Sequence, residues 1–215
     1  QNKVWVGLSK ETAHQLGTPI SSLMAWMDLL ESSGVDPSLL SDMNKDVNRL
    51  SVIAERFSKI GSKPEMELIY VNEVLENATE YMRRRVSDKV LITTHLPSDA
   101  EGAMVCLSLF EWVIENLCKN AVDAMNGEGR IDVYMTSEKQ QIYIDIKDTG
   151  KGIARKNFKT VFNPGYTTKK RGWGLGLTLA KRIIEDYHAG RIYVKDSEVG
   201  KGTTFRIESV SYTHL

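Results

Sequence analysis

The apolar residues at the start of the chain recur at alternating steps of four and three, and this spacing constrains the fold more than any other feature. It is typical of helices that pack along an apolar seam. From Lys3 to about Glu31, the seam comprises Leu16, Ile20, Leu23, Met27 and Leu30. After an interruption at 32–37, a second seam comprises Leu40, Met43, Val47, Leu50, Ala54 and Phe57. The first 62 residues are therefore predicted to form a helical hairpin.

Two helices of this length cannot enclose a hydrophobic core by themselves. Two copies of the hairpin can cover both seams if they pair as a four-helix bundle. We therefore expect the chain to form a homodimer through residues 1–62.

After Pro64 the apolar pattern changes to strands that alternate with helices. Period-two segments at 131–135 and 142–146 predict an antiparallel hairpin with one buried face. A largely apolar run at 108–125 predicts a buried helix that Asn126 and Gly127 end. The other predicted elements are a strand at 68–71, a helix that Asn72 caps, a strand at 90–96, a helix at 175–188 that Gly190 caps, and strands at 191–195 and 203–207.

Together these elements predict an α+β fold. A helical hairpin that forms a dimeric four-helix bundle precedes an α/β sandwich, in which helices cover one face of a mixed sheet. The predicted domains are residues 1–62 and 65–210, with a linker at 63–64. Residues 211–215 continue no periodicity and are predicted to be a loose tail.

The charges of the chain balance, with 28 Lys and Arg residues against 28 Asp and Glu residues. Because no net charge attracts nucleic acid or an anionic membrane, we expect no nucleic-acid partner and no direct membrane contact. Cys106 and Cys118 lack metal-ligand spacing and are predicted to be small core residues in a reducing compartment. We expect a cytoplasmic fragment of a longer protein, whose remainder can include a membrane anchor.

The first candidate site is the sequence His-Gln-Leu-Gly-Thr-Pro that begins at His14. At about 100° per residue, His14 lies on the opposite side of the helix from the apolar seam, so its imidazole is predicted to face solvent. An exposed imidazole can attack a phosphate group that is delivered to it. The alternative is a surface histidine that takes part in no reaction.

The second candidate site lies on the predicted helix at 108–125. Asn116 and Asn120 are four residues apart and share one helix face, so both amide oxygens can bind one Mg²⁺ ion. Asp123 extends this polar strip by a further turn. A polar face turned toward water is the alternative, but the flanking residues are mostly apolar.

Two glycine-rich segments form the third candidate site. Asp148 ends a predicted strand, and its carboxylate can accept a hydrogen bond from an adenine amino group, while Gly150 and Gly152 let the base approach the backbone. The second segment precedes the helix at 175–188, where backbone amides can bind phosphate oxygens. Its glycines are Gly172, Gly174 and Gly176. Each segment alone is also consistent with an ordinary turn.

The order of these motifs resembles the histidine kinase family over nearly the whole chain. The resemblance consists of a phosphoacceptor box at His14, an asparagine box at 116–124, glycine boxes at 148–152 and 172–176, a phenylalanine segment at 158–162, and a final Gly-Thr-Thr-Phe at 202–205. The nucleotide-site boxes also resemble a wider ATPase superfamily that includes gyrase-type topoisomerases and certain chaperones. Only the hairpin with His14 narrows the resemblance to kinases.

The resemblance implies a sensor histidine kinase of a two-component system, with a Bergerat-type ATP-binding domain at 65–210. Such an enzyme would use ATP and Mg²⁺ to phosphorylate His14 and would transfer the phosphoryl group to an aspartate on the receiver domain of a response regulator. Phosphatase activity toward that partner is a further expectation.

The same resemblance implies roles for individual residues. Asn116 and Asn120 would hold Mg²⁺, Asp148 would bind adenine, and the base pocket would be shaped by Gly150, Gly152 and Thr203. Residues 163–171 would cover the phosphates, with Lys169 as a phosphate contact and with hinge and backbone donors at Gly172, Gly174 and Gly176. Thr18, four residues after His14, would position a water molecule that removes phosphate from the partner's aspartate.

Two positions depart from the family pattern. An acidic residue usually follows the phosphoacceptor histidine, whereas this chain has Gln15, whose carbonyl can orient the imidazole but cannot stabilise an imidazolium as a carboxylate would. Asp123 stands where many members have a basic residue, which leaves a larger share of phosphate binding to Lys169 or Lys170.

Three other functions fit parts of the pattern. They are an ATPase module that changes conformation without phosphorylating a histidine, a kinase that phosphorylates serine on another protein, and a docking scaffold without catalysis.

Overall fold

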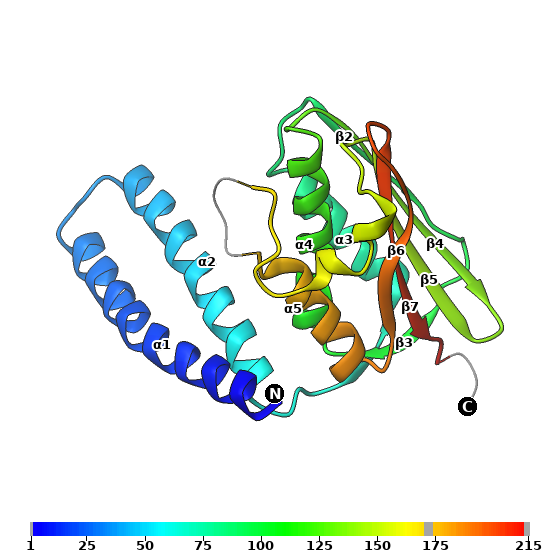
Figure 1. The fold of residues 1–215 in the computed structure, drawn as a ribbon. Helices are drawn as coiled ribbons and strands as arrows, with labels where there is room; N and C mark the ends of the chain where they lie inside the picture. Colours follow the sequence, from blue (N-terminus) through cyan, green and yellow to red (C-terminus); the bar gives the residue numbers. More distant parts are fainter. Residues whose placement is uncertain (1, 170–173, 213–215) are drawn as a thin grey trace. The chain divides into compact units, whose positions relative to one another are not determined.

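The computed structural model describes residues 2–169 and 174–212. The chain forms two compact units, Gln1–Pro64 and Glu65–Leu215. The first consists of two helices, and the second combines helices with β-sheet (Figure 1). The predicted α+β fold class is thus confirmed.

The first unit is a hairpin of helices α1 (Asn2–Ser32) and α2 (Pro37–Gly61). Gly34 lies in the connecting turn with a φ of +79°, which glycine adopts without strain. Asp36 caps α2, because its carboxylate accepts a hydrogen bond from the backbone N–H of Ser38 at 2.9 Å. Pro37 occupies the first turn, where no backbone donor is needed.

Only part of the predicted apolar seam is buried within one hairpin. Ile20, Met27 and Val47 form its core, and Leu16 and Ala54 pack against them. Three other seam residues stay 40–43% exposed, namely Leu23, Met43 and Leu50. A single hairpin therefore leaves a second apolar face uncovered.

The second unit contains two sheets. The smaller pairs β1 (Glu67–Tyr70) with β3 (Gly102–Val105) in antiparallel orientation. The larger has the strand order β2 (Val90–His95), β4 (Gly129–Glu138), β5 (Gln141–Asp148), β7 (Gly202–Val210) and β6 (Arg191–Glu198). The β2–β4 pair is parallel and the other pairs are antiparallel.

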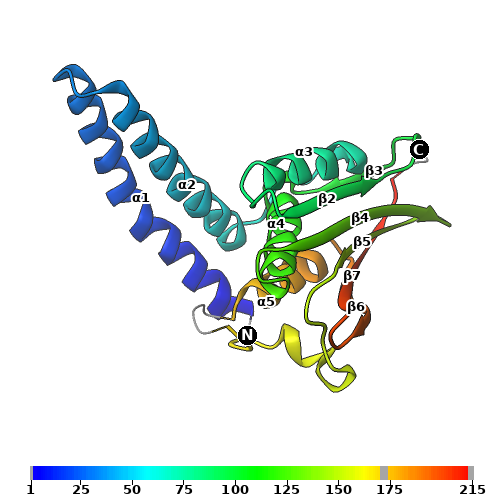
Figure 2. The same ribbon diagram turned by 90° about the horizontal axis from the view of Figure 1, so that it is seen from above.

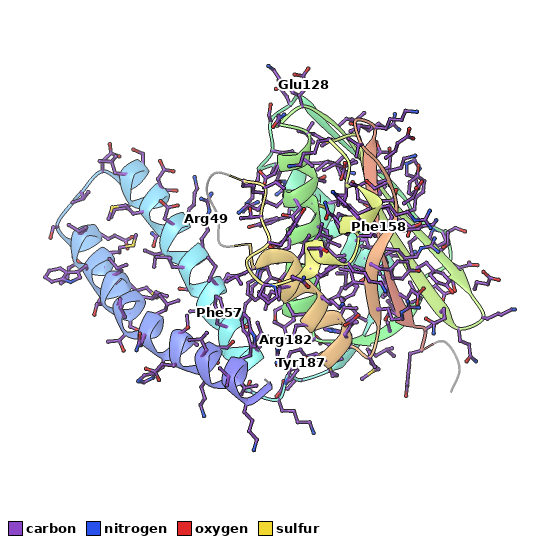
Figure 3. The ribbon with its side chains drawn as sticks, viewed as in Figure 1. Arg49, Phe57, Glu128, Phe158, Arg182 and Tyr187 are labelled. Carbon is purple, nitrogen blue, oxygen red and sulfur yellow. The ribbon has the colours of Figure 1, made fainter. Side chains whose placement is uncertain are left out.

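Three helices cover one face of the larger sheet (Figure 2). They are α3 (Val71–Arg83), α4 (Leu107–Ala124) and α5 (Gly176–Arg182). Short 3₁₀ turns at Arg155–Asn157 and Thr160–Phe162 precede α5, and a π-helical turn at Ile183–Tyr187 follows it. Side chains fill the space between the helices and the sheet (Figure 3).

The core of the second unit follows the period-two prediction. Its inward sheet residues are buried, and they include Ile131, Val133, Met135, Ile142, Ile144 and Ile146. Helix α4 covers them with an apolar face that includes Leu109, Phe110, Val113, Ile114 and Leu117. Each such side chain stabilises the fold by about 1.5–3 kcal/mol, which makes this layer the main source of stability.

The opposite face of the sheet carries polar contacts within and between strands. Asp132 accepts a hydrogen bond from Arg130 Nε at 2.9 Å, and its Oδ1 lies 2.8 Å from His95 Nε2. The same His95 stacks on Tyr134, with ring centroids 4.4 Å apart. These contacts pair the carboxylate of Asp132 with protein groups.

Two predictions of local structure, the cap at Asn72 and the loose tail, are wrong. Asn72 does not cap α3, which begins one residue earlier; its side chain instead donates to the backbone carbonyls of Pro97 and Asp99 and accepts from the N–H of Glu101. The helix predicted at 175–188 is confirmed as α5 followed by a π-helical turn, and beyond its end the N–H of Gly190 donates to Ile184 O at 3.0 Å. The predicted tail is not loose at its start, because Ser211 N–H donates to Gln140 O at 2.7 Å and Tyr212 N–H donates to Gly102 O at 2.7 Å.

His188 secures the end of the π turn. Its Nδ1 lies 2.9 Å from Ile183 O, and its Nε2 accepts a hydrogen bond from Cys106 N–H at 3.1 Å. Burial lowers the pKa of His188, so the neutral ring is the stable form. This side chain therefore links the end of the α5 segment to the start of α4.

Both cysteines are buried and unpaired, as predicted. Burial raises the pKa of Cys118 to about 12, so this thiol is unreactive. Among the described residues, no helix combines the length and apolarity needed to cross a membrane.

Candidate functional site

His14 lies on the exposed side of α1, as its position relative to the apolar seam predicts. The neighbouring Gln15 is also exposed, and its Nε2 donates a hydrogen bond to Glu11 Oε1 at 2.8 Å. Glu11 therefore places a carboxylate one helical turn before Gln15. Thr18 is exposed as well, so the side chains predicted to do chemistry on this helix are open to solvent.

Helix α4 supplies the polar strip predicted from its sequence. Asn116 is half-buried, and its Nδ2 is a buried atom without a hydrogen-bond partner among the described residues. An unsatisfied buried amide costs about 1–3 kcal/mol, which a ligand atom at this point would offset. One turn later, Asn120 Oδ1 accepts a hydrogen bond from Lys169 Nζ at 3.4 Å. Lys169 also forms an ion pair with Asp123.

Asp148 lies at the end of β5 and is only 3% exposed. Its Oδ1 accepts hydrogen bonds from Gly150 N–H at 2.8 Å and from Thr203 N–H at 3.3 Å. Burial raises the pKa of this carboxyl, and these two hydrogen bonds oppose the rise. One carboxylate oxygen is thus committed to the backbone.

The glycines that follow Asp148 are required by close backbone approaches. A Cβ at Gly150 would lie 2.6 Å from Ala124 O, and a Cβ at Gly152 would lie 2.1 Å from Glu198 O. Gly152 also has a φ of +75°, which favours glycine. The sequence predicted these positions from the motif, and the structure gives the steric reason.

Thr203 is buried beside this turn, and its hydroxyl lies 2.8 Å from the hydroxyl of Ser197. Ser197 also accepts a hydrogen bond from the N–H of Ile153 at 2.7 Å. Ser197 thereby joins β6 and β7 to the glycine turn. Ser197 is not predicted from the sequence, because it follows a β-bulge between Val194 and Asp196 that has no recognisable sequence pattern.

The segment 163–169 precedes the second glycine box. The N–H of Gly165 donates to Gly174 O at 3.1 Å, and Gly174 has a φ of +63° with no room for a Cβ. Gly176 begins α5, and a Cβ there would meet nothing within 4 Å. Gly172 lies outside the described residues, as do Lys170 and Arg171.

Phe162, in the predicted phenylalanine segment, contacts both β7 and α5. Phe162 is buried and packs edge-on against Phe205, with ring centroids 6.0 Å apart. Its carbonyl accepts a hydrogen bond from the hydroxyl of Thr178 on α5 at 2.8 Å. Phe158 lies in the turn between the two 3₁₀ segments (Figure 3). These contacts hold α5 against the sheet.

The C-terminal end of α4 brings the predicted nucleotide-site residues of the second unit together. Lys151 N–H donates to Ala124 O at 2.9 Å, so the glycine turn after Asp148 is bonded to the helix turn that follows Asn120. Within the part of the chain that is described, no group of three His, Cys, Asp or Glu residues could hold a metal ion. Asn116 and Asn120 place amide oxygens, which are suitable ligands for a hard cation, on this helix.

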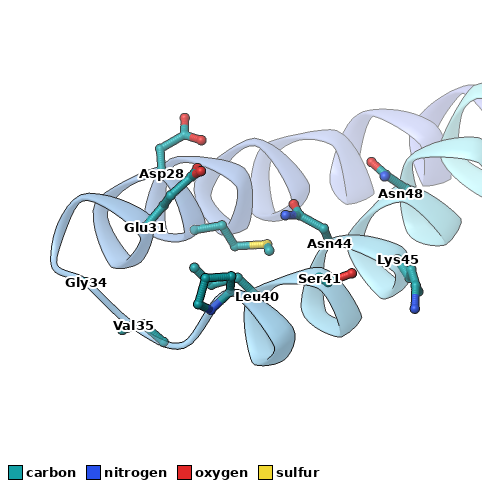
Figure 4. Close-up of a pocket in the computed structure, with 11 residues that line it drawn as sticks. Asp28, Glu31, Gly34, Val35, Leu40, Ser41, Asn44, Lys45 and Asn48 are labelled. Carbon is teal, nitrogen blue, oxygen red and sulfur yellow. The ribbon is translucent and has the colours of Figure 1, made fainter.

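A groove of about 600 Å³ lies at the turn of the helical hairpin, lined by residues that include Met27, Glu31, Val35, Leu40 and Asn44 (Figure 4). His14 is not among its lining residues. The groove therefore does not mark a site around the candidate phosphoacceptor.

A family model described as "Histidine kinase-, DNA gyrase B-, and HSP90-like ATPase" matches residues 106–213. Sporulation kinase A of Bacillus subtilis (strain 168) is 27% identical over 206 residues, which cover 93% of this chain and 34% of the relative. Sporulation kinase E of the same organism is 30% identical, and the alignment covers 93% of this chain and 28% of the relative. The chain thus spans about a third of the length of these relatives.

Solved structures with a similar fold are also histidine kinases. Full-length ShkA in complex with AMPPNP has a TM-score of 0.73 at 18% identity, and the match covers 97% of this chain and 46% of that chain. The histidine kinase ThkA in complex with response regulator protein TrrA has a TM-score of 0.62 at 20% identity, over 96% of this chain and 61% of that chain. At this level of identity, the match establishes the fold.

Proposed function

The chain belongs to the family of histidine kinase-, DNA gyrase B- and HSP90-like ATPases, and on this premise we propose that it is the catalytic core of a histidine protein kinase. It would phosphorylate its own His14 with ATP and pass the phosphoryl group to an aspartate of a response regulator. The observation that carries this proposal is an exposed histidine on a helical hairpin in the same chain as a family ATPase domain. Residues 1–62 would be the dimerisation and phosphoacceptor domain, and residues 65–210 the ATP-binding domain.

The hydrogen bonds of Asp148 support the proposed nucleotide site. The free oxygen of Asp148 would accept a hydrogen bond from the adenine amino group, because Oδ1 is already bonded to two backbone N–H groups. The walls of the base pocket would be formed by Gly150, Gly152 and Thr203. Lys169 would contact the phosphates, together with backbone donors at Gly172, Gly174 and Gly176.

Asn116 and Asn120 would hold Mg²⁺ through their side-chain amides. The ammonium group already bonded to the Asn120 oxygen fits a site for a positive ion. The unsatisfied Nδ2 of Asn116 is a donor, and it would pair with a phosphate oxygen beside that ion. When bound, Mg²⁺ would neutralise charge that develops on the phosphates during transfer.

In the proposed reaction, His14 Nε2 forms a bond to the γ-phosphorus of ATP as the bond to the bridging oxygen breaks, and ADP leaves. The imidazole becomes positively charged and then loses its Nδ1 proton. Gln15 would orient the ring through its amide, in place of the acidic residue that is usual in the family.

The chemical stability of the labelled product tests this proposal against the alternatives. After incubation with ATP labelled at the γ-phosphate, the label on the chain should be lost in acid and retained in alkali, as expected for phosphohistidine. Label that survives acid and is lost in alkali would indicate phosphoserine instead. Hydrolysis of ATP without any label on the chain would indicate an ATPase module.

We expect Gln15→Glu to raise the rate of self-phosphorylation by about two- to ten-fold, because a carboxylate stabilises the imidazolium better than an amide does. In the unaltered chain, Glu11 accepts a hydrogen bond from Gln15. The single variant instead places two like charges four residues apart on the helix, at positions 11 and 15. The double variant Glu11→Gln with Gln15→Glu restores a hydrogen-bonded pair with the roles exchanged. It should keep the full gain, whereas no gain in either variant would show that position 15 does not limit the reaction.

The partner of the proposed kinase is a receiver domain. ThkA has been solved in complex with a response regulator, which supports this class of partner for a chain of the same fold. The exposed hydroxyl of Thr18 would position a water molecule that removes phosphate from the receiver's aspartate. An unchanged dephosphorylation rate in Thr18→Ala would contradict this role.

We also infer a homodimer through the first unit. Large apolar side chains on both helices remain exposed in a single hairpin, among them Leu23, Trp26, Leu29, Met43 and Leu50. Pairing with a second copy would remove this apolar area from water. Sedimentation of the full chain as a monomer at micromolar concentration would contradict the inference.

A further inference from the structure

Two consecutive residues before the second glycine box, Thr168 and Lys169, form side-chain contacts with different parts of the second unit. Thr168 Oγ1 accepts a hydrogen bond from Lys151 Nζ, and Lys151 belongs to the glycine turn after β5. Lys169 forms an ion pair with Asp123 and donates to Asn120 Oδ1, both on α4. Lys169 is therefore held by side chains distant in sequence.

Backbone hydrogen bonds order the same segment. The N–H of Lys169 donates to Thr167 Oγ1 at 3.0 Å, and the N–H of Tyr166 donates to Asn163 O at 3.1 Å. A lysine side chain has four flexible carbon–carbon bonds, so its ammonium group takes a defined position only when a partner fixes it. In this structure Asp123 is the only carboxylate that forms an ion pair with Lys169 among the described residues.

The Asp123–Lys169 ion pair lies beside Asn120, the proposed Mg²⁺ ligand. Asp123 lies three residues after Asn120 on α4, so its carboxylate brings the ammonium group of Lys169 to the amide oxygen proposed to face Mg²⁺ and the phosphates. The two side chains of the ion pair are 42% and 40% exposed, which leaves the ammonium group accessible to an incoming anion. Through this ion pair, the carboxylate of Asp123 can influence phosphate binding by fixing the position of Lys169.

We propose that Asp123 is a positioning residue that holds Lys169 at the phosphate end of the nucleotide site. This inference rests on the proposed nucleotide site and assigns a role to a residue that departs from the family pattern. It differs from a direct role of Asp123 as a metal ligand, because the effect of Asp123 on nucleotide binding passes entirely through Lys169.

Amide hydrogen exchange of the full chain without nucleotide tests the first half of the proposal. Asp123→Asn should accelerate exchange at Lys169 and its neighbours in 163–169 by about two- to five-fold, the range expected for a partly exposed ion pair. Asp123→Glu should restore most of the protection. The matched control is Asp99→Asn, which removes an exposed carboxylate from a loop of the same unit and should change nothing. Unchanged exchange in Asp123→Asn would overturn the proposal.

A double-mutant cycle on ATP affinity tests the second half. Asp123→Asn should weaken binding by about two- to five-fold, and Lys169→Met should weaken it by at least as much. In the Lys169→Met background, Asp123→Asn should have no further effect. A persistent effect there, with a shifted dependence on Mg²⁺, would show that Asp123 is a metal ligand and overturn the positioning role. If the unaltered chain bound no ATP, the proposed function would fail, whereas the exchange experiment would still test the ion pair.

Discussion

Replacing His14 by alanine should abolish the transfer of phosphoryl groups from ATP to the chain, with ATP affinity unchanged. The loss should be complete, because no other group replaces the imidazole nitrogen that forms the new bond to phosphorus. Affinity should persist, because His14 belongs to the helical hairpin and the proposed nucleotide residues belong to the other unit. The measurements are incorporation of γ-phosphate label and calorimetric titration with ATP.

A second histidine provides the control for this variant. His95 lies on the outer face of the sheet, where it contacts Asp132 and stacks on Tyr134. His95→Asn removes an imidazole from the ATP-binding unit without touching the proposed nucleotide residues, so label incorporation should stay close to that of the unaltered chain. Label that persists in His14→Ala would refute His14 as the phosphoacceptor.

Replacing Asp148 by asparagine should weaken ATP binding by about 10- to 100-fold, the equivalent of one hydrogen bond to a charged group. An asparagine oxygen can still accept the hydrogen bonds from Gly150 and Thr203. Its amide NH₂ group would instead meet the adenine amino group, and two donors cannot pair. The substitution should thus act on the ligand while the surrounding turn is preserved.

Thermal unfolding separates this effect from a loss of fold. Because burial raises the pKa of Asp148, its ionised form costs folding free energy near neutral pH, and Asp148→Asn should be at least as stable as the unaltered chain. The matched control is Asp132→Asn on the outer face, which should lower the unfolding temperature by breaking contacts with Arg130 and His95 but leave ATP affinity unchanged. Full affinity in Asp148→Asn would exclude this carboxylate from adenine binding.

Apolar periodicity was sufficient to predict most of the fold. The period-two pattern at 131–135 and 142–146 places the same side chains in the core that the structure buries. Periodicity predicts which face of a helix or strand is apolar, but it does not identify the part of the protein or the partner that covers this face. Leu23, Met43 and Leu50 therefore belong to the predicted seam and yet remain exposed in one hairpin.

Local propensity failed where a long-range contact decided the conformation. Asn72 has the side chain of a helix cap, but it bonds to the loop at 97–101. The π turn after Arg182 coincides with the bonds that His188 makes to Ile183 and Cys106, and no local pattern contains that information. The Asp123–Lys169 pair is likewise invisible in the sequence, because the two residues are widely separated along the chain.

The parallel pairing of β2 with β4 has a consequence for the order in which the domain can fold. Antiparallel neighbours such as β4 and β5 close through a short turn, whereas β2 reaches β4 only after residues 96–128, including all of α4, have been placed. Contacts of this long sequence separation carry a larger loop-closure entropy and form slowly. Helix α4, which carries Asn116 and Asn120, lies within the segment that this pairing must close, so the proposed site should be completed only after the β4–β5 hairpin has formed.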